Sequence, residues 1–494
     1  MSFRSVVMVG GALALSSCSF VLDHSNRQCT EDADCAHFDA LSTCQDSLCA
    51  EPPILLGQSA PATGSSQALG LEMNRGLQLA FDAVNAQGGV KGRQIKLQFL
   101  DDQYDPALAE SNARTLTDAQ PSTEAPHCPT TATPPAGGTA FSQTALNAGA
   151  SAVLAMVGSV GTPTMVRAAP VTVETGRLFF GAFTGATSML RNTAAGSCAK
   201  YIFNMRASYA QEAMATLQYF LVLKVPDDAH LISFDQNDTF GDAGYNGLVA
   251  AYQALKNVAP NIHRFRYTRN DVNSVPSQVT ATADYLTTLL MADTAPHVVG
   301  IMMTDTYGPG ATYIKGLKDW LNANDAQQAS LHKASRLTLY FSNVSFVGPD
   351  ALAAQLHAQG TFTTPAGTTE AYLDRVFVSQ VVPNYATDAN EVVVEYRRLL
   401  AAAGARPSFT SLEGYLAGRL FIEGLKNNKD AVTPDSMVQA FETLPAVNLA
   451  LGAAAGFSPT NHQYSQSVWG TGFNPDGTFA NTYFYSNGSL QLFQ

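Results

Sequence analysis

From Ile54 onward, short apolar strands alternate with amphipathic helices, and this alternation limits the fold more than any other feature of the sequence. One helix face is marked by apolar residues at helical spacing: Leu69, Met73, Leu77, Phe81 and Val84. Residues 94–102 then alternate apolar and polar side chains at strand period. Further strand candidates, each followed by a helical pattern or a turn, cover 54–57, 152–158, 230–235, 297–303 and 337–342. The sequence therefore predicts an α/β chain with parallel sheets.

The composition supports a large folded body and excludes two classes of protein. Of the 494 residues, 46% are hydrophobic and only 14% are charged, which excludes disorder of the whole chain. The 28 Lys and Arg set against 40 Asp and Glu give a net charge of −12. Such an acidic surface lacks the cationic stripe that a general nucleic-acid binder needs. The length suggests two to four domains, at roughly 100–200 residues each.

The first 18 residues are predicted to be a lipoprotein signal peptide. Arg4 precedes a ten-residue apolar run from Val6 to Leu15. This run is too short for a bilayer core, which needs about 20 residues in a helix, but it fits a secretory signal. The run ends in Leu-Ser-Ser-Cys, which resembles a bacterial lipobox whose cysteine, here Cys18, carries the lipid. The alternative is an ordinary signal peptide in which Cys18 has no role.

Residues 19–51 form a polar segment with four closely spaced cysteines, Cys29, Cys35, Cys44 and Cys49. Exported chains meet oxidising conditions, so we interpret this segment as a spacer held by two disulfides. Three pairings are possible, and the spacing does not choose among them. A zinc site is the alternative, although the paired CxxC knuckles typical of zinc sites are missing.

The stretch from Pro121 to Gly138 is rich in Pro, Thr and Ala and interrupts the strand–helix rhythm, as an inserted surface loop would. It contains Cys128, and the other cysteine of the main body is Cys198. A bridge between these two is the economical interpretation in an oxidising compartment, with two free thiols as the alternative. The seven cysteines then become one lipid acceptor and three bridges, with no free thiol.

The sequence contains no motif of a known catalytic or cofactor site. A GxSxG elbow, an HExxH helix and a GxxxxGK[ST] loop are all missing, and the nine histidines do not pair at ligand spacing. We therefore expect neither an enzyme nor a bound metal or cofactor, although a catalytic triad can assemble from distant residues.

Two loops after predicted strands are rich in donors for an anion. Thr162 is a suitable N-cap and Pro163 a suitable first residue for a helix, whose free N–H groups and dipole attract an anion. The hydroxyls of Thr162 and Thr164 add donors, and the loop 181–187 after the next strand has similar small and hydroxylic residues. Ligands of open α/β sheets collect at the carboxyl ends of strands, so this pair of loops predicts a carboxylate site. The alternative is an ordinary capped helix.

Several ordered segments of the body carry a family resemblance. They include GQSAPATGSSQALGLEMNRGLQLAFDAVNAQGG, VGSVGTPTMVRAA, GAFTGATSMLR, YIFNMRASYAQE, DQNDTFGDAGYNGL, SFTSLEGYLAGRLFIEGL and GFSPTNHQYS. The sequence resembles the substrate-binding proteins of bacterial branched-chain amino-acid ABC importers, of the leucine/isoleucine/valine type. The resemblance implies the two-lobed α/β clamp of type I periplasmic binding proteins, with three chain crossings near 201–206, 381–385 and 456–460. Lobe 1 would combine 52–203 with 384–456, and lobe 2 would combine 204–383 with 457–494.

The resemblance also implies a set of ligand-binding residues. In lobe 1, two loops would hold the α-carboxylate and part of the ammonium of a ligand, through Ser159, Gly161, Thr162, Thr164, Phe183, Thr184 and Gly185. The aromatic residue expected from lobe 2 matches Phe240, for which core packing is the alternative. The acid expected beside the ammonium matches Asp350 or Asp305, and capping of a helix is the alternative for Asp350. An aromatic residue expected in the first loop is replaced by Leu69.

The resemblance implies a lipid-anchored protein of the bacterial periplasm or cell envelope. It would capture a small polar molecule, an amino acid or similar zwitterion, and deliver it to an ABC permease. One alternative is a sensory receptor that uses the same clamp. Another, of a different class, is an exported α/β hydrolase.

Overall fold

A computed structural model describes residues 28–35, 42–128, 145–187, 198–323, 329–452 and 455–493. The predicted signal peptide, its lipid acceptor Cys18 and residues 129–138 of the insertion lie outside these ranges. The chain divides into two compact units, Met1–Pro52 and Pro53–Gln494, which are described separately.

The first unit is a short hairpin held by two disulfides. It contains a 3₁₀ turn, η1 (Asp32–Cys35), and the antiparallel strands β1 (Thr43–Gln45) and β2 (Leu48–Ala50). Of the three possible pairings, the structure has Cys29–Cys44 and Cys35–Cys49. The four sulfurs are therefore joined in S–S bonds and offer no thiolates for zinc, so the disulfide interpretation of this segment is confirmed.

Lobe 1 of the second unit is built on a five-stranded parallel sheet of order β4-β3-β7-β8-β9. The strands are β3 (Ile54–Ala60), β4 (Ile95–Asp101), β7 (Ala155–Val157), β8 (Leu178–Phe180) and β9 (Ile202–Phe203). Its early helices are α1 (Gln67–Asn85), α2 (Pro106–Leu116) and α3 (Thr162–Glu174), beside the small hairpin β5 (Ala119–Pro121) and β6 (Leu146–Ala148).

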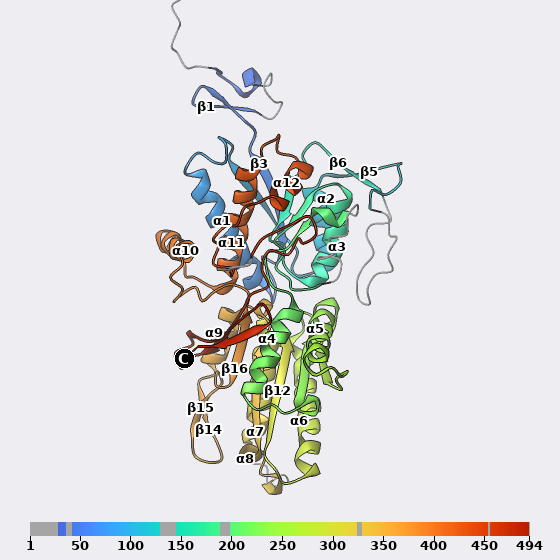
Figure 1. Ribbon diagram of the computed structural model, residues 1–494, viewed down its shortest axis with the longest axis vertical. Helices are drawn as coiled ribbons and strands as arrows, with labels where there is room; N and C mark the ends of the chain where they lie inside the picture. Colours follow the sequence, from blue (N-terminus) through green and yellow to red (C-terminus); the bar gives the residue numbers. More distant parts are fainter. Residues whose placement is uncertain are drawn as a thin grey trace, which may run out of the picture. The chain divides into compact units, whose positions relative to one another are not determined.

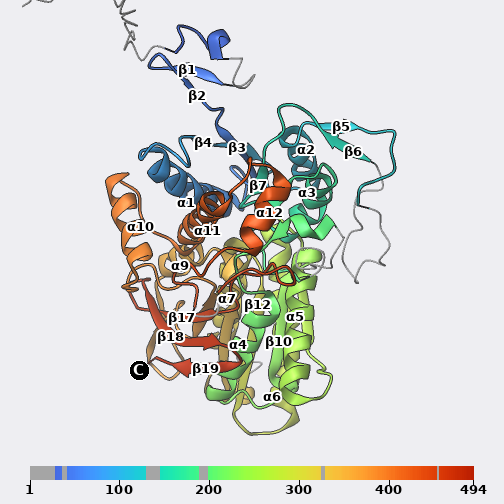
Figure 2. The same cartoon turned by 45° about the horizontal axis from the view of Figure 1, so that its top comes forward.

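Three later helices return to lobe 1: α10 (Glu391–Ala402), α11 (Phe409–Asn427) and α12 (Pro434–Glu442). Figure 2 shows α11 beside α1, although more than 300 residues separate them in the sequence. Two glycines permit this close contact, because a Cβ on Gly76 would lie 2.0 Å from the Ser411 carbonyl oxygen and one on Gly414 would lie 2.3 Å from that of Met73. Of the apolar stripe of α1, Leu69, Met73, Leu77 and Phe81 are buried and Val84 is half-buried.

Lobe 2 is built on an eight-stranded mixed sheet of order β11-β10-β12-β13-β16-β17-β18-β19. Its parallel strands are β10 (Leu231–Gln236), β11 (His263–Tyr267), β12 (His297–Thr304), β13 (Leu337–Asn343) and β16 (Val376–Gln380). Its antiparallel strands are β17 (Val468–Phe473), β18 (Phe479–Ser486) and β19 (Ser489–Leu492).

Helices flank this sheet, and Figure 1 shows α4 to α7 running along it in the lower half of the view. They are α4 (Tyr209–Val222), α5 (Thr239–Lys256), α6 (Val275–Ala292), α7 (Tyr307–Asn322), α8 (Lys333–Arg336) and α9 (Pro349–Ala358). A small hairpin, β14 (Thr361–Thr363) and β15 (Thr369–Ala371), follows α9. The predicted α/β class with parallel sheets is confirmed, and the antiparallel edge β17–β19 is an addition that the sequence analysis did not predict.

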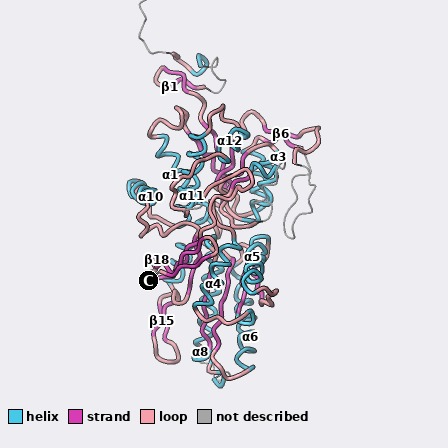
Figure 3. The backbone as a smooth tube through the Cα atoms, in the orientation of Figure 1, coloured by secondary structure: helices cyan, strands magenta, loops and turns pink. Residues whose placement is uncertain are grey.

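The chain passes between the two lobes at three places, which the tube of Figure 3 traces as pink loops between the lobes. The first and third passages run side by side, because the Asn204 N–H donates to the His462 carbonyl oxygen over 2.8 Å and the Tyr464 N–H donates to that of Asn204 over 2.8 Å. The third passage lies after the predicted 456–460. Phe457 still packs against Phe180 and Phe203 of lobe 1, and residues 458–461 form a tight turn.

Among the helices that the structure describes, none is both long enough and apolar enough to cross a membrane.

Candidate ligand-binding site

The carboxyl ends of the two sheets meet at the junction between the lobes. Lobe 1 contributes Tyr104 after β4 and the loops after β7 and β8, and lobe 2 contributes the loops after β10, β12 and β13. Contacts cross the junction directly, since the Gln236 amide donates to the Tyr104 hydroxyl over 3.4 Å and the Tyr104 ring centroid lies 6.1 Å from that of Phe346. This is where open α/β sheets bind ligands.

The two lobe 1 loops that we expected to bind a carboxylate are joined by backbone hydrogen bonds. The Phe183 N–H donates to the Ser159 carbonyl oxygen over 2.8 Å, and the Gly161 N–H donates to that of Phe183 over 3.2 Å. Gly161 is the N-cap of α3, so the helix begins at Thr162, one residue earlier than predicted. Gly161 has φ +100°, and a Cβ there would lie 2.3 Å from the Tyr104 ring, so only glycine fits this cap.

Two threonine hydroxyls from these loops meet at the beginning of α3. Thr162 Oγ1 lies 2.7 Å from Thr184 Oγ1, which also receives the Ala186 N–H and lies 3.4 Å from the Tyr209 hydroxyl. The Gly185 carbonyl oxygen accepts the Tyr209 N–H over 2.8 Å, which fixes α4 against this loop. Thr164 differs, because its hydroxyl donates back to the carbonyl oxygens of Val160 and Gly161. Its hydroxyl is therefore used within its own helix.

The junction also concentrates polar atoms that have no partner within the protein. Among the described residues, eight buried side-chain N or O atoms lack one, and five of the eight belong to residues at this junction. The five atoms are Ser66 Oγ, Ser159 Oγ, Arg206 Nε, Thr239 Oγ1 and Asp305 Oδ2. A buried polar group without a hydrogen bond is unfavourable by about 1–3 kcal/mol, so such a concentration requires an explanation.

Asp305 presents one such atom from lobe 2. Its Oδ1 accepts the Asn343 amide over 2.6 Å, while Oδ2 is free, and the residue is fully buried. Burial raises the pKa of Asp305 well above its usual range. The hydrogen bond from Asn343 lowers the pKa in part, and the negative charge of Asp235 raises it further. A cation placed beside Oδ2 would favour the ionised form again.

Asp350, the other predicted acid, has intramolecular partners for both carboxylate oxygens. Oδ1 accepts the Tyr385 hydroxyl over 2.8 Å, and Oδ2 accepts the Phe409 N–H at the beginning of α11 over 2.9 Å. Burial raises the pKa of Asp350 to about 6, despite these two hydrogen bonds. In this structure Asp350, on α9 of lobe 2, accepts an N–H at the beginning of α11 of lobe 1. It therefore caps a helix, as the alternative interpretation proposed, but a helix of the other lobe.

Phe240 and Phe183 belong to a group of aromatic side chains that fills the junction. Phe346 is its centre, with ring centroids 4.6 Å from Phe240, 5.1 Å from Phe183 and 6.1 Å from Tyr104, and Tyr209 lies 5.6 Å from Phe240. All five are at most 1% exposed. Tyr104, Tyr209 and Phe346 were not predicted from the sequence, although Phe346 lies in the same FVGPD segment as Asp350.

Arg206 is a buried charge that sequence analysis placed only at a chain crossing. Its guanidinium pairs with Glu212 of α4 at 3.0 Å and with Glu413 of α11 at 3.3 Å, and it also donates to the Ser345 hydroxyl. Burial alone would lower the pKa of Arg206, but the two carboxylates outweigh it and raise the pKa. One guanidinium therefore joins a carboxylate from each lobe.

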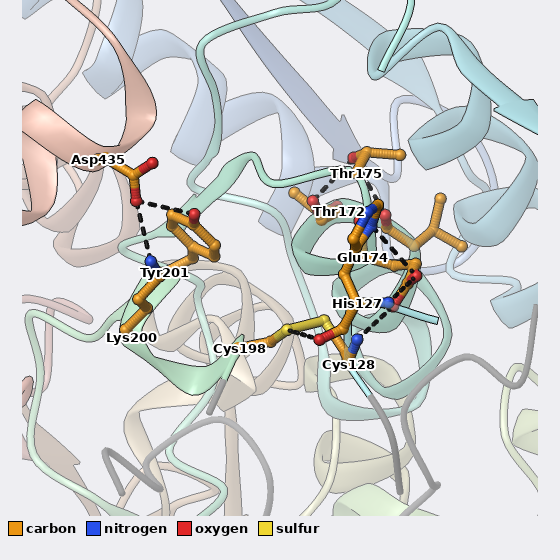
Figure 4. Close-up of a disulfide and its surroundings, with 10 residues drawn as sticks. His127, Cys128, Thr172, Glu174, Thr175, Cys198, Lys200, Tyr201 and Asp435 are labelled. Atoms are coloured by element: carbon orange, nitrogen blue, oxygen red, sulfur yellow. Dashed lines mark hydrogen bonds and ion pairs between the residues drawn. A yellow bond between two sulfur atoms is a disulfide. The ribbon is translucent and has the colours of Figure 1, made fainter. Parts of the chain in front are cut away.

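Outside the junction, the structure contains the predicted Cys128–Cys198 bridge. Figure 4 shows Glu174, at the end of α3, above the bridge and next to His127. The buried Glu174 carboxylate accepts the N–H groups of His127 over 2.7 Å and of Cys128 over 2.8 Å. Beyond the bridge, Lys200 and Tyr201 both donate to Asp435 over 2.9 Å. The bridge therefore attaches the beginning of the insertion to the body of lobe 1.

Comparisons with known proteins agree with this architecture. The family model described as periplasmic binding protein matches residues 53–123 and 320–478. The solved structure of a possible leucine/isoleucine/valine-binding protein from Rhodopirellula baltica is 28% identical, with a TM-score of 0.65 over 87% of this chain and 95% of that one. The branched-chain amino-acid ABC transporter protein from Thermus thermophilus, with bound valine, is 14% identical with a TM-score of 0.60, over 87% and 96% of the two chains, and shows the same fold.

A curated relative, the Leu/Ile/Val-binding protein homolog 2 of Brucella abortus, is 45% identical over 53 residues. That match covers 11% of this chain and 14% of the relative. The family binds small-molecule ligands outside the cytoplasm, which agrees with the polar junction described above. The chain is thus similar in sequence to the periplasmic binding proteins over residues 53–123 and 320–478, and it has the two-lobed fold of their type I form.

Proposed function

We propose that this protein captures a small zwitterion, such as an amino acid, between its two lobes and delivers it to an ABC permease. The observation that carries the proposal is the concentration of partnerless buried polar atoms at the junction, where the carboxyl ends of both sheets meet. A ligand with both hydrogen-bond donors and acceptors would give these atoms partners. Contacts to both lobes at once would also drive closure of the clamp.

The two lobes suit opposite ends of a zwitterion. In lobe 1, Ser159 Oγ, the Thr162–Thr184 hydroxyl pair and the beginning of α3 provide donors for a carboxylate. In lobe 2, Asp305 Oδ2 provides an acceptor for an ammonium group. An ammonium beside Asp305 would ionise this carboxyl and form a charge-assisted hydrogen bond, which is stronger than a neutral one. We therefore assign Asp305, rather than Asp350, to the ammonium.

We place the hinge at the three crossings between the predicted lobes, 52–203 with 384–456 and 204–383 with 457–494, and move the third crossing beyond residue 461 because Phe457 packs on lobe 1. The backbone pairing of Asn204 with residues 462–464 would hold the first and third crossings together while the lobes rotate. The Cys18 lipid anchor in the cell envelope is part of this proposal, and the Cys-rich segment would then separate anchor from clamp. A sensory receptor with the same clamp is the alternative, and permease genes beside this gene would favour import.

A thermal-shift screen of the mature protein tests the proposal. Amino acids, matched carboxylic acids without the amino group, and matched amines without the carboxylate should be compared at equal concentration. Because a ligand stabilises only the folded state, zwitterions should raise the melting temperature by more than either partial ligand. Equal shifts from the acids and the zwitterions would contradict the ammonium site at Asp305, and no shift from any of the three sets would contradict the function.

A further inference from the structure

Phe346 occupies the centre of the junction between the two ends of the proposed ligand site. Its ring lies 5.1 Å from Phe183, in the loop that pairs with Ser159, and 4.6 Å from Phe240 in lobe 2. It is fully buried, as are Tyr104 and Phe240. Ring centroids at these distances are in direct contact, so a second ring does not fit among them.

The backbone that carries Phe346 is fixed on both sides. Before it, the Ser345 N–H donates to Glu212 over 2.8 Å and the Ser345 hydroxyl receives Arg206. After it, Gly348 has φ +79°, and a Cβ there would lie 2.7 Å from the Leu69 side chain. Phe346 is thus a fixed wall of the site, because its short 3₁₀ turn, η7 (Ser345–Val347), is held by buried charges and by contact with α1.

We propose that Phe346 sets the upper size of the ligand. The proposal rests on the proposed function, because it assumes a zwitterion whose carboxylate lies at the loop 159–164 and whose ammonium lies at Asp305. The side chain of that zwitterion points toward the Phe346 ring, which closes this end of the site, so a larger side chain would need the space that the ring fills. The protein therefore accepts amino acids with small side chains, from glycine to valine, and excludes those with an aromatic ring.

The test compares wild-type protein with Phe346→Ala and Phe346→Leu in the full mature chain. Calorimetric titration with glycine, L-alanine, L-valine and L-phenylalanine measures size selection. The wild type should bind at least one small member and L-phenylalanine at least tenfold more weakly. Phe346→Ala should bind L-phenylalanine at least tenfold more tightly than the wild type does. Leucine fills more of the space of the Phe346 ring than alanine does, so Phe346→Leu serves as the test if Phe346→Ala does not fold.

A ligand-independent probe separates this proposal from the function on which it rests. Benzene enters dry apolar cavities, so the ring-sized space left in Phe346→Ala should bind benzene while the wild type does not. Phe234→Ala is the matched control, because Phe234 is fully buried within lobe 2, where its ring lies 3.7 Å from that of Tyr313. This control should gain benzene binding without gaining L-phenylalanine.

The outcomes are distinct. The size limit is wrong, and the proposed function stands, if the wild type binds small amino acids but Phe346→Ala gains neither benzene nor L-phenylalanine. The same conclusion follows if the wild type binds L-phenylalanine as tightly as L-valine. If Phe346→Ala gains benzene but no amino acid binds to either protein, the proposed function is wrong, and the role of Phe346 in it falls as well.

Discussion

The carboxylate of Asp350, in the first turn of α9, accepts the N–H of Phe409, the first residue of α11, over 2.9 Å. This hydrogen bond crosses from lobe 2 to lobe 1, so it exists only when the lobes are in contact. The same carboxylate accepts the Tyr385 hydroxyl at the second chain crossing, and Glu72 of α1 lies close enough to oppose its charge. The carboxylate of Asp350 thus links lobe 2 to lobe 1 and to the second chain crossing.

Stability should depend on pH through Asp350. Its folded pKa of about 6 lies above the usual 3.8, so the folded protein takes up this proton first as pH falls. Protonation of Asp350 therefore stabilises the folded protein fully below about pH 4, and this stabilisation is lost as pH rises through about 6. Above that pH, the ionised and buried Asp350 lowers the free energy of unfolding by about 2–3 kcal/mol. Asp350→Asn should therefore be more stable than wild type at pH 7.5, with the difference shrinking at pH 5. Urea unfolding at both values measures it, and a pH-independent difference would contradict the assignment.

The Arg206 cluster should be essential for stability. Arg206→Met removes the guanidinium and leaves Glu212 and Glu413 buried without their cation. Breaking a buried ion pair in this way typically destabilises by about 3–5 kcal/mol. Arg167→Met is the matched control, because Arg167 forms an exposed pair with Glu110 and such pairs contribute about 0–1 kcal/mol. Equal losses of unfolding free energy in the two variants would show that Arg206 is not held as described.

The Cys128–Cys198 bridge should stabilise the body of the protein. It closes a loop of 70 residues, so replacing both cysteines with serine should lower the unfolding free energy by about 2–4 kcal/mol. Replacing Cys29 and Cys44, in the separate first unit, is the control and should leave the unfolding of the body unchanged. A thiol-reactive label should find no free thiol in the mature wild-type protein. Equal stability of wild type and the Cys128/Cys198 variant would contradict the role of the bridge.

Thr162→Val should weaken binding of any zwitterion found by the screen. Valine keeps the shape of threonine but removes the hydroxyl that lies 2.7 Å from Thr184, so Kd should rise by about 5- to 150-fold, or about 1–3 kcal/mol. Thr172→Val is the matched control in the same helix, where the hydroxyl donates to Ala168 and lies away from the site. Unchanged affinity in Thr162→Val would remove Thr162 from the carboxylate site.

Local sequence patterns predicted most of lobe 1 and the parallel part of lobe 2. The stripe from Leu69 to Val84 became α1 (Gln67–Asn85), because a helix with a single apolar face can bury that face in the core. The strand patterns at 54–57 and 337–342 became β3 and β13, which are mostly buried. The alternating pattern at 95–99 became β4, an edge strand whose apolar side chains are buried or half-buried and whose polar side chains are exposed. The pairing of β16 with β17 was not predictable, because 87 residues separate these strands and no local pattern encodes the register.

In the candidate site, too, local patterns predicted some residues, and contacts between distant parts of the chain determine the others. The beginning of α3 could be predicted to within one residue, because Thr162 and Pro163 are typical of a helix start, although the cap is Gly161. The pairing of Arg206 with Glu413, and the contact of Phe346 with Phe183, join residues more than 160 positions apart. They depend on how the lobes meet, which periodicity and propensity do not describe. The partners of Asp350, which lie on α11 and at the second crossing, depend on the same meeting of the lobes.

Hydrogen exchange of the backbone amides, with and without the best zwitterion from the screen, tests most directly whether the ligand binds between the lobes. We expect slower exchange in both lobes at once, over 158–164 and 183–186 in lobe 1 and over 239–241 and 304–310 in lobe 2. Exchange at the ends of the sheets away from the junction should be unchanged. Slower exchange confined to one lobe, or located away from the junction, would contradict capture between the lobes.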